Sequence, residues 1–145
     1  MKSKKVIWIY ITFALVLTGL ISMSSCGGGG GSDTPDVAAL LKSGQWKVQA
    51  VKVDGSNQLS LFTGFRITFS GSSFTATNGG PVWPATGTWT LNSAGTIITR
   101  GDGLTVTIDN ISDTVLALSL TWDKTTLGGG RSGSIEGSHV FTFGK

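Results

Sequence analysis

The chain has 145 residues, of which 39% are hydrophobic and only 13% are charged, and its formal net charge is +3. Three of its eleven basic residues (Lys2, Lys4 and Lys5) precede Cys26, whereas all eight acidic residues follow it, so basic and acidic residues balance after Cys26. That balance removes the basic surface on which nucleic-acid binding depends, and we expect no nucleic-acid partner.

The first 26 residues follow a pattern typical of a secretion signal. After the lysines comes an apolar run at positions 6–21, and two small residues, Ser24 and Ser25, directly precede Cys26. This order resembles the signal peptide and lipobox of a bacterial lipoprotein. The resemblance implies cleavage of residues 1–25 and attachment of palmitate and related acyl chains to Cys26. It also implies a lipid anchor in the outer membrane of a Gram-negative cell envelope, facing the periplasm or the cell surface.

Two other interpretations of this leader stay open. The apolar run approaches the ~17 residues that span a bilayer, so it could remain as an uncleaved anchor. Ordinary cleavage could instead leave Cys26 as a free thiol. Lipidation is preferred because Cys26 is the only cysteine, so no disulfide can form, and because five glycines follow it at once. Residues 26–32 then make a lipidated cysteine and a flexible glycine-rich tether.

Residues 33–145 are enough for one domain with a single hydrophobic core. A short helix is expected at 33–42, because Asp33 or Thr34 can cap it and Asp36 complements the positive end of the helix dipole. The apolar side chains of this helix share one face. We expect that face to lie over the open end of an apolar interior.

From residue 44 onward the hydrophobic period is two, which is typical of half-buried strands. A change of phase near Ala50 and Val51 predicts a β-bulge in the first strand. No helix-length segment separates the strands, which excludes a parallel sheet built of βαβ units. We therefore expect an all-β domain, an eight-stranded antiparallel up-and-down barrel, because closure removes the exposed edges. The strands are expected at 46–53, 65–69, 74–77, 87–91, 96–100, 104–109, 116–122 and 139–143.

Two short motifs resemble the lipocalin (calycin) superfamily. Gly44-Gln45-Trp46, after the short helix, resembles the G-x-W motif that opens the first lipocalin strand. The segment 87–91 resembles the mid-domain G-x-W strand of small bacterial lipocalin-like lipoproteins. The similarity covers roughly residues 33–145, and no arginine follows the last strand to stack on Trp46. The resemblance implies a barrel that holds an apolar ligand, and it implies no catalytic residues.

The inward phase of the strands identifies candidate ligand-binding residues. A barrel of eight strands is just wide enough to be packed solid or to hold one small ligand, and the sequence does not choose between these. If the barrel is hollow, we expect a continuous interior cavity of about 300 Å³ or more, holding a small apolar or amphipathic molecule. The residues expected to line it are Phe65, Phe69, Trp89, Leu118, Trp122 and Phe141.

A second hypothesis places the function on the outside of the barrel. Trp83 lies between Pro81 and Pro84, which argues for a loop rather than a central strand. An exposed aromatic residue on a loop can mark a contact with sugar, lipid or protein. The chain would then be an interaction module that binds a glycan or a protein partner through its loops or its threonine-rich outer face.

Catalytic and metal chemistry find little support in the sequence. His139 is the only histidine, and a metal site needs several ligands that this chain does not supply together. Ser138 and His139 are neighbours on a strand, so their side chains point to opposite faces and cannot form a nucleophile–base pair. We expect no catalytic residues, no metal and no cofactor, and the sequence does not specify an oligomeric state.

Overall fold

The computed structural model describes residues 35–123 and 135–145 of the chain. The expected signal peptide (1–25), the lipidated Cys26 and the tether (26–32) lie outside this part. The two expected helix caps, Asp33 and Thr34, lie outside it as well.

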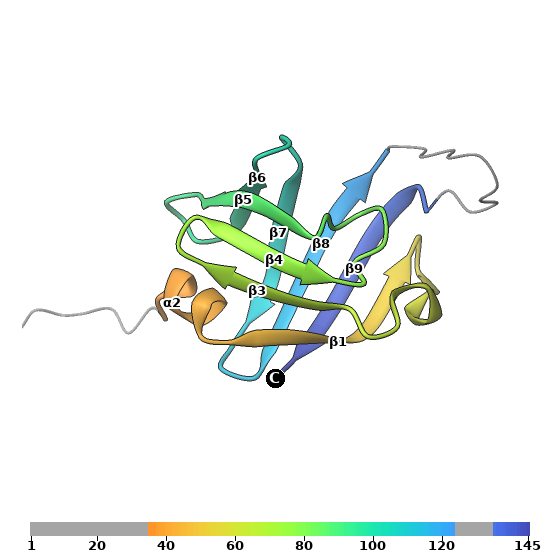
Figure 1. Ribbon diagram of the computed structural model, residues 1–145, viewed down its shortest axis with the longest axis horizontal. Helices are drawn as coiled ribbons and strands as arrows, with labels where there is room; N and C mark the ends of the chain where they lie inside the picture. Colours follow the sequence, from red (N-terminus) through yellow and green to blue (C-terminus); the bar gives the residue numbers. More distant parts are fainter. Residues whose placement is uncertain (1–34, 124–134) are drawn as a thin grey trace, which may run out of the picture. The chain divides into compact units, whose positions relative to one another are not determined.

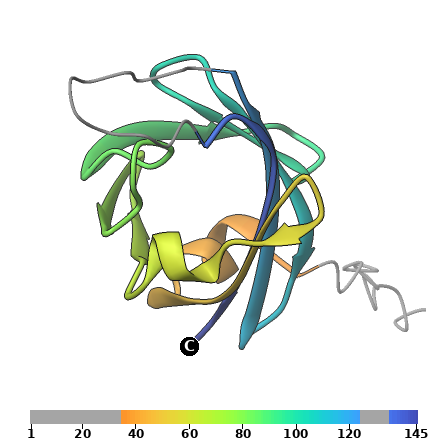
Figure 2. The ribbon, with the colours of Figure 1, turned by 90° about the vertical axis from the view of Figure 1, so that its right-hand side faces the viewer.

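The segments with a period of two are strands, and every pairing between neighbouring strands is antiparallel. β1 pairs with β3, each strand from β3 to β8 pairs with the next, and β1 also pairs with β9, which closes the sheet (Figures 1 and 2). β2 is a two-residue extension that pairs only with β1. The predicted all-β, eight-stranded antiparallel barrel is therefore confirmed. The strands are β1 (Gln45–Val53), β2 (Ser56–Asn57), β3 (Arg66–Ser70), β4 (Ser73–Thr77), β5 (Thr86–Leu91), β6 (Ile97–Arg100), β7 (Thr105–Ile111), β8 (Val115–Trp122) and β9 (Gly137–Gly144).

The predicted bulge in the first strand is present. The register of β1 against β9 shifts between Val48 and Ala50. Before the shift Trp46 is buried, and after it the buried residues are Val51 and Val53, on the other parity. An extra residue lets a strand bend and twist more strongly, which helps the sheet to close.

A short helix, α2 (Val37–Lys42), covers one end of the barrel, which we call the α2 end (Figure 1). It begins later than expected, because the carboxylate of Asp36 accepts a hydrogen bond from the backbone N–H of Ala39 at 3.1 Å and acts as the cap. The indole N–H of Trp46 donates to the carbonyl of Leu41 at 3.0 Å. The Lys145 ammonium lies 4.6 Å from the Trp46 ring centroid and makes a cation–π contact with it.

The opposite end of the barrel, which we call the η1 end, carries the 3-10 helix η1 (Leu59–Phe62) between β2 and β3. In an up-and-down barrel the strands alternate in direction. This end therefore holds the N-terminal ends of β3, β5, β7 and β9 and the C-terminal ends of β1, β4, β6 and β8. Residues that are far apart in the sequence come together here, and this is where the polar groups of the interior gather.

Candidate functional site

Aromatic rings fill the η1 end. Phe62, Phe65, Trp83 and Phe141 are all buried and contact one another edge-on or tilted. Ring centroids are 5.1 Å apart for Phe62 and Phe141, 5.7 Å for Phe65 and Phe141, and 6.1 Å for Phe65 and Trp83. Such geometries bring the positive edge of one ring to the negative face of another. These four residues and His139 are called the η1-end cluster below.

Trp83 lies on the β4–β5 loop as predicted, but the expectation that it is exposed is wrong, since only 2% of its surface is accessible. The loop turns inward, with the backbone N–H of Trp83 donating to the carbonyl of Gly79 at 3.1 Å. A Cβ atom at Gly79 would lie 2.4 Å from the Cβ of Trp83, so only glycine permits this close approach. Trp83 therefore belongs to the interior and is not available as a surface contact.

Arg100 locks this loop against the barrel, a role that the sequence analysis missed. Its guanidinium is 3% exposed and lies 5.0 Å from the Trp83 ring and 5.9 Å from the Phe74 ring. It donates to the carbonyl of Val82 at 2.6 Å and forms an ion pair with Asp102 at 2.5 Å. The period-two pattern offered one indication, because Arg100 has the same parity on β6 as the buried Ile98.

His139 is fully buried within the cluster. Its ring stacks on Phe141 at 5.7 Å and meets Phe62 edge-on at 6.2 Å. The Nδ1 atom lies 3.0 Å from the carbonyl oxygen of Gly137. Since a carbonyl only accepts, Nδ1 carries the proton, and Nε2 of the neutral ring is an acceptor. Burial lowers the pKa of His139, although the Gly137 carbonyl and the nearby Asp54 carboxylate both favour the protonated ring.

Two buried polar atoms of this cluster have no hydrogen-bond partner among the described residues: Nε1 of Trp83, a donor, and Nε2 of His139, an acceptor. Most buried polar side-chain atoms in proteins are paired, because leaving one unpaired costs about 1–3 kcal/mol. The two atoms are of opposite character and lie in otherwise aromatic surroundings.

All six residues expected to line the interior are buried, and all six belong to one hydrophobic core. Phe65 and Phe141 belong to the η1-end cluster. Phe69 and Trp89 pack against each other at 5.2 Å, and the Trp89 indole N–H donates to the carbonyl of Ser73 at 2.9 Å. Leu118 pairs with Phe141 across β8 and β9, and Trp122 lies at the end of β8. Ring contacts continue from Phe69 through Phe74 and Trp83 to Phe65 and Phe141.

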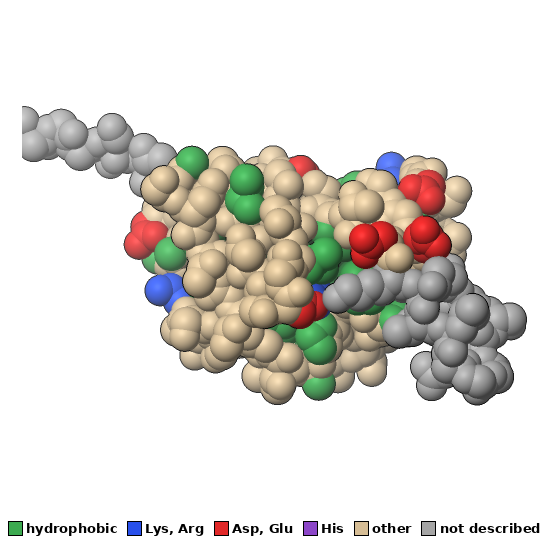
Figure 3. All heavy atoms as spheres, turned by 90° about the horizontal axis from the view of Figure 1, so that it is seen from above, with side chains coloured by type: hydrophobic (Ala, Val, Ile, Leu, Met, Phe, Trp, Pro, Cys, Tyr) green, Lys and Arg blue, Asp and Glu red, His purple; other side chains and the backbone are tan. Residues whose placement is uncertain are grey.

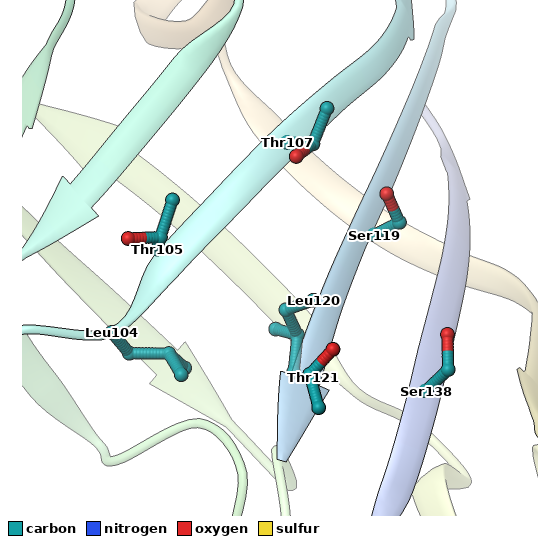
Figure 4. Close-up of a pocket in the computed structure, with 7 residues that line it drawn as sticks. All are labelled: Leu104, Thr105, Thr107, Ser119, Leu120, Thr121 and Ser138. Carbon is teal, nitrogen blue, oxygen red and sulfur yellow. The ribbon is translucent and has the colours of Figure 1, made fainter.

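A hollow lined by described residues lies in the barrel wall. It has a volume of about 380 Å³ and is lined from β7, β8 and β9 (Figure 4). The pairing of β7 with β8 stops at Thr107 and Ser119, and neither Thr105 nor Thr121 takes part in it. We call this opening the β7–β8 gap. Seen from above, the surface of the domain shows hydrophobic side chains with acidic side chains beside them (Figure 3).

A second hollow of about 220 Å³ lies beside Arg100 and is lined by Phe74, Pro84 and the 86–88 and 100–102 segments. The guanidinium there already has partners in Val82 and Asp102. Within the described residues no three His, Cys, Asp or Glu side chains form a group that could hold a metal ion. In the same part of the chain, no helix has the length and apolarity to cross a membrane.

Comparison of the chain with protein-family models, with curated proteins and with solved structures found no match. The class of protein therefore rests on the coordinates, which define a closed eight-stranded antiparallel barrel with a buried aromatic and polar site at one end and an opening in its wall.

Proposed function

We propose that this chain is a lipid-anchored protein of the Gram-negative cell envelope, held at the outer membrane through Cys26. Its barrel binds one small amphipathic molecule at the η1 end and catalyses no reaction. The leader supports the anchor, because a positively charged start, an apolar run and small residues before a lone cysteine favour lipidation. Two or more acyl chains would give the stable attachment that a single chain does not.

The observation that carries the binding function is the pair of buried, unpartnered atoms Trp83 Nε1 and His139 Nε2. A hydroxyl group can donate to His139 and can accept from Trp83, and the surrounding rings favour an apolar body. We place the ligand at the η1 end, where these two atoms lie, and in the adjoining β7–β8 gap. The ligand is therefore a mostly apolar molecule that carries at least one uncharged hydrogen-bonding group.

A binding role is preferred to an enzymatic one because the reactive side chains are kept apart. His139 is buried while Ser138, its neighbour on β9, is exposed on the outer face. The aromatic rings packed against the His139 ring are Phe62 and Phe141, which can neither attack a substrate nor transfer a proton. The histidine is therefore placed to accept a hydrogen bond from a bound molecule.

Native mass spectrometry of the detergent-extracted full chain tests both parts of the proposal. We expect a mature protein that begins at Cys26 and carries acyl chains, together with a non-covalent small molecule that is released on collisional activation. The Cys26→Ser variant should lose the acyl mass and keep the small molecule. An unacylated wild-type chain would contradict the anchor, and a ligand-free barrel after mild extraction would contradict the binding function.

A further inference from the structure

The opening between β7 and β8 lies where the pairing of these two strands stops before the strands themselves end. β7 pairs with β6 through Thr105, Val106 and Thr107, and β8 pairs with β9 as far as Trp122. Between β7 and β8, however, the pairs end at Thr107 and Ser119. In the same register Val106 would pair with Leu120 and Thr105 with Thr121, and neither pair forms. Thr105 and Thr121 instead line the hollow of about 380 Å³, a volume in the range of small-molecule pockets.

The rim of the gap is rich in hydroxyl groups and its deeper part is apolar. Leu120 is buried and Leu104 is half-buried, and in Figure 4 both side chains extend into the space between the two strands. Leu120 pairs with His139 across β8 and β9, so the apolar part of the gap lies next to the η1-end cluster. The hydroxyl-bearing residues of the rim are Thr105, Thr107, Ser119, Thr121 and Ser138.

The rim selects for an uncharged head group. Among the described residues no charged side chain lines the hollow, so a charged group entering it would lose water without direct contact with a counter-ion on its wall. Hydroxyl side chains both donate and accept, which suits the hydroxyl groups of a polyol. Ser119 already donates to the Asp109 carboxylate at 2.9 Å, and this neighbouring negative charge further disfavours an anionic head.

We propose that the β7–β8 gap is the passage and head-group site for the ligand of the barrel. The ligand is an uncharged amphipathic molecule with a hydroxylated head, of the monoacylglycerol class. Its head group lies among the rim hydroxyls, and its apolar part passes Leu104 and Leu120 to reach the η1-end cluster. This inference rests on the proposed binding function and adds to it a route, a site and a chemical class.

The test uses the full chain in lipid nanodiscs, titrated with 1-monodecanoylglycerol and followed by tryptophan fluorescence. Thr105→Val and Thr121→Val, combined, remove two rim hydroxyls and keep the β-branched shape. Losing two hydrogen bonds of about 1 kcal/mol each should weaken binding by at least tenfold. The matched control combines Thr68→Val with Thr75→Val, a directly paired set of threonines on β3 and β4, and should change binding less than twofold.

The charge of the probe provides the second arm. Decanoate and decyltrimethylammonium have similar apolar chains, and each should bind at least tenfold more weakly than 1-monodecanoylglycerol. Equal affinity for all three probes would overturn the gap proposal. An equal loss of affinity in the Thr105/Thr121 and Thr68/Thr75 double variants would overturn it as well. Either result would leave an interior binding site in place. If no probe binds and native mass spectrometry still shows a co-purifying molecule, the proposed function survives and the ligand class is wrong.

Discussion

The ring of Trp83 should contribute to the stability of the fold, because it is packed in the interior. Its ring packs against Phe65, Phe74 and the Arg100 guanidinium, whereas its indole N–H contributes no hydrogen bond within the described residues. Trp83→Ala should lower the free energy of unfolding by about 3–5 kcal/mol, as for other large side chains removed from cores. Denaturant unfolding at constant temperature measures this loss.

The control for that substitution is Leu61→Ala in η1, where the side chain is 53% exposed. It should change the free energy of unfolding by no more than about 0.5 kcal/mol. A loss at Trp83 as small as the one at Leu61 would contradict its place in the η1-end cluster.

His139 predicts how stability depends on pH. Because burial lowers its pKa in the folded chain, the unfolded chain takes up a proton at a higher pH than the folded chain does. The free energy of unfolding should therefore fall as the pH drops below about 6.5, the ordinary histidine value, until the pKa of the folded state is passed. Denaturant unfolding of wild type and His139→Gln between pH 7.5 and 5 isolates this contribution. A flat difference between the two proteins would contradict it.

At the scale of elements, helix α2 depends on its cap. Asp36→Ala removes the acceptor for the Ala39 N–H and should cost about 1 kcal/mol of stability. Asp36→Asn retains a capping oxygen and should cost much less, since asparagine caps about as well as aspartate. Thermal unfolding of the two variants provides the comparison. Equal losses would indicate that the carboxylate acts through its charge and not through the hydrogen bond.

The strands were predictable because alternation and glycine-rich turns are local properties of the sequence. The bulge in β1 was predictable for the same reason, since the phase of the buried residues changes within one strand. Phe62 and Trp83 were not, because η1 and the β4–β5 loop have no period from which burial can be read. Their burial depends on neighbours brought in by β3 and β9.

The burial of Arg100 and the β7–β8 gap could not be predicted from residue types, because both depend on tertiary contacts. From its hydropathy alone, Arg100 is predicted to be exposed to solvent. Its burial is made favourable by its ring contacts, the Val82 carbonyl and Asp102. The β7–β8 gap arises from where a ladder stops, and the alternating pattern continues through Thr105 and Thr121 without a break. The candidate site was therefore only partly predictable, through inward residues such as Phe65 and Phe141.

At the scale of the whole molecule, closure makes a prediction about hydrogen exchange. β9 pairs with β8 on one side and with β1 on the other, so no backbone amide in the interior of β9 faces an open edge. Its amides should exchange as slowly as those of β3 and β4 in the intact chain. Mass spectrometry after exchange and pepsin digestion measures this. Alternate amides of β1 or β9 exchanging within seconds would indicate an open sheet.

The binding claim is tested most directly by the indole N–H resonances in a ¹H–¹⁵N spectrum of the full chain titrated with 1-monodecanoylglycerol. The Trp83 resonance, assigned with Trp83→Phe, should shift strongly downfield as its N–H gains an acceptor. The Trp46 resonance should stay in place, because its N–H is already bonded to Leu41 at the α2 end. A Trp83 resonance that does not move at saturating ligand would contradict the account.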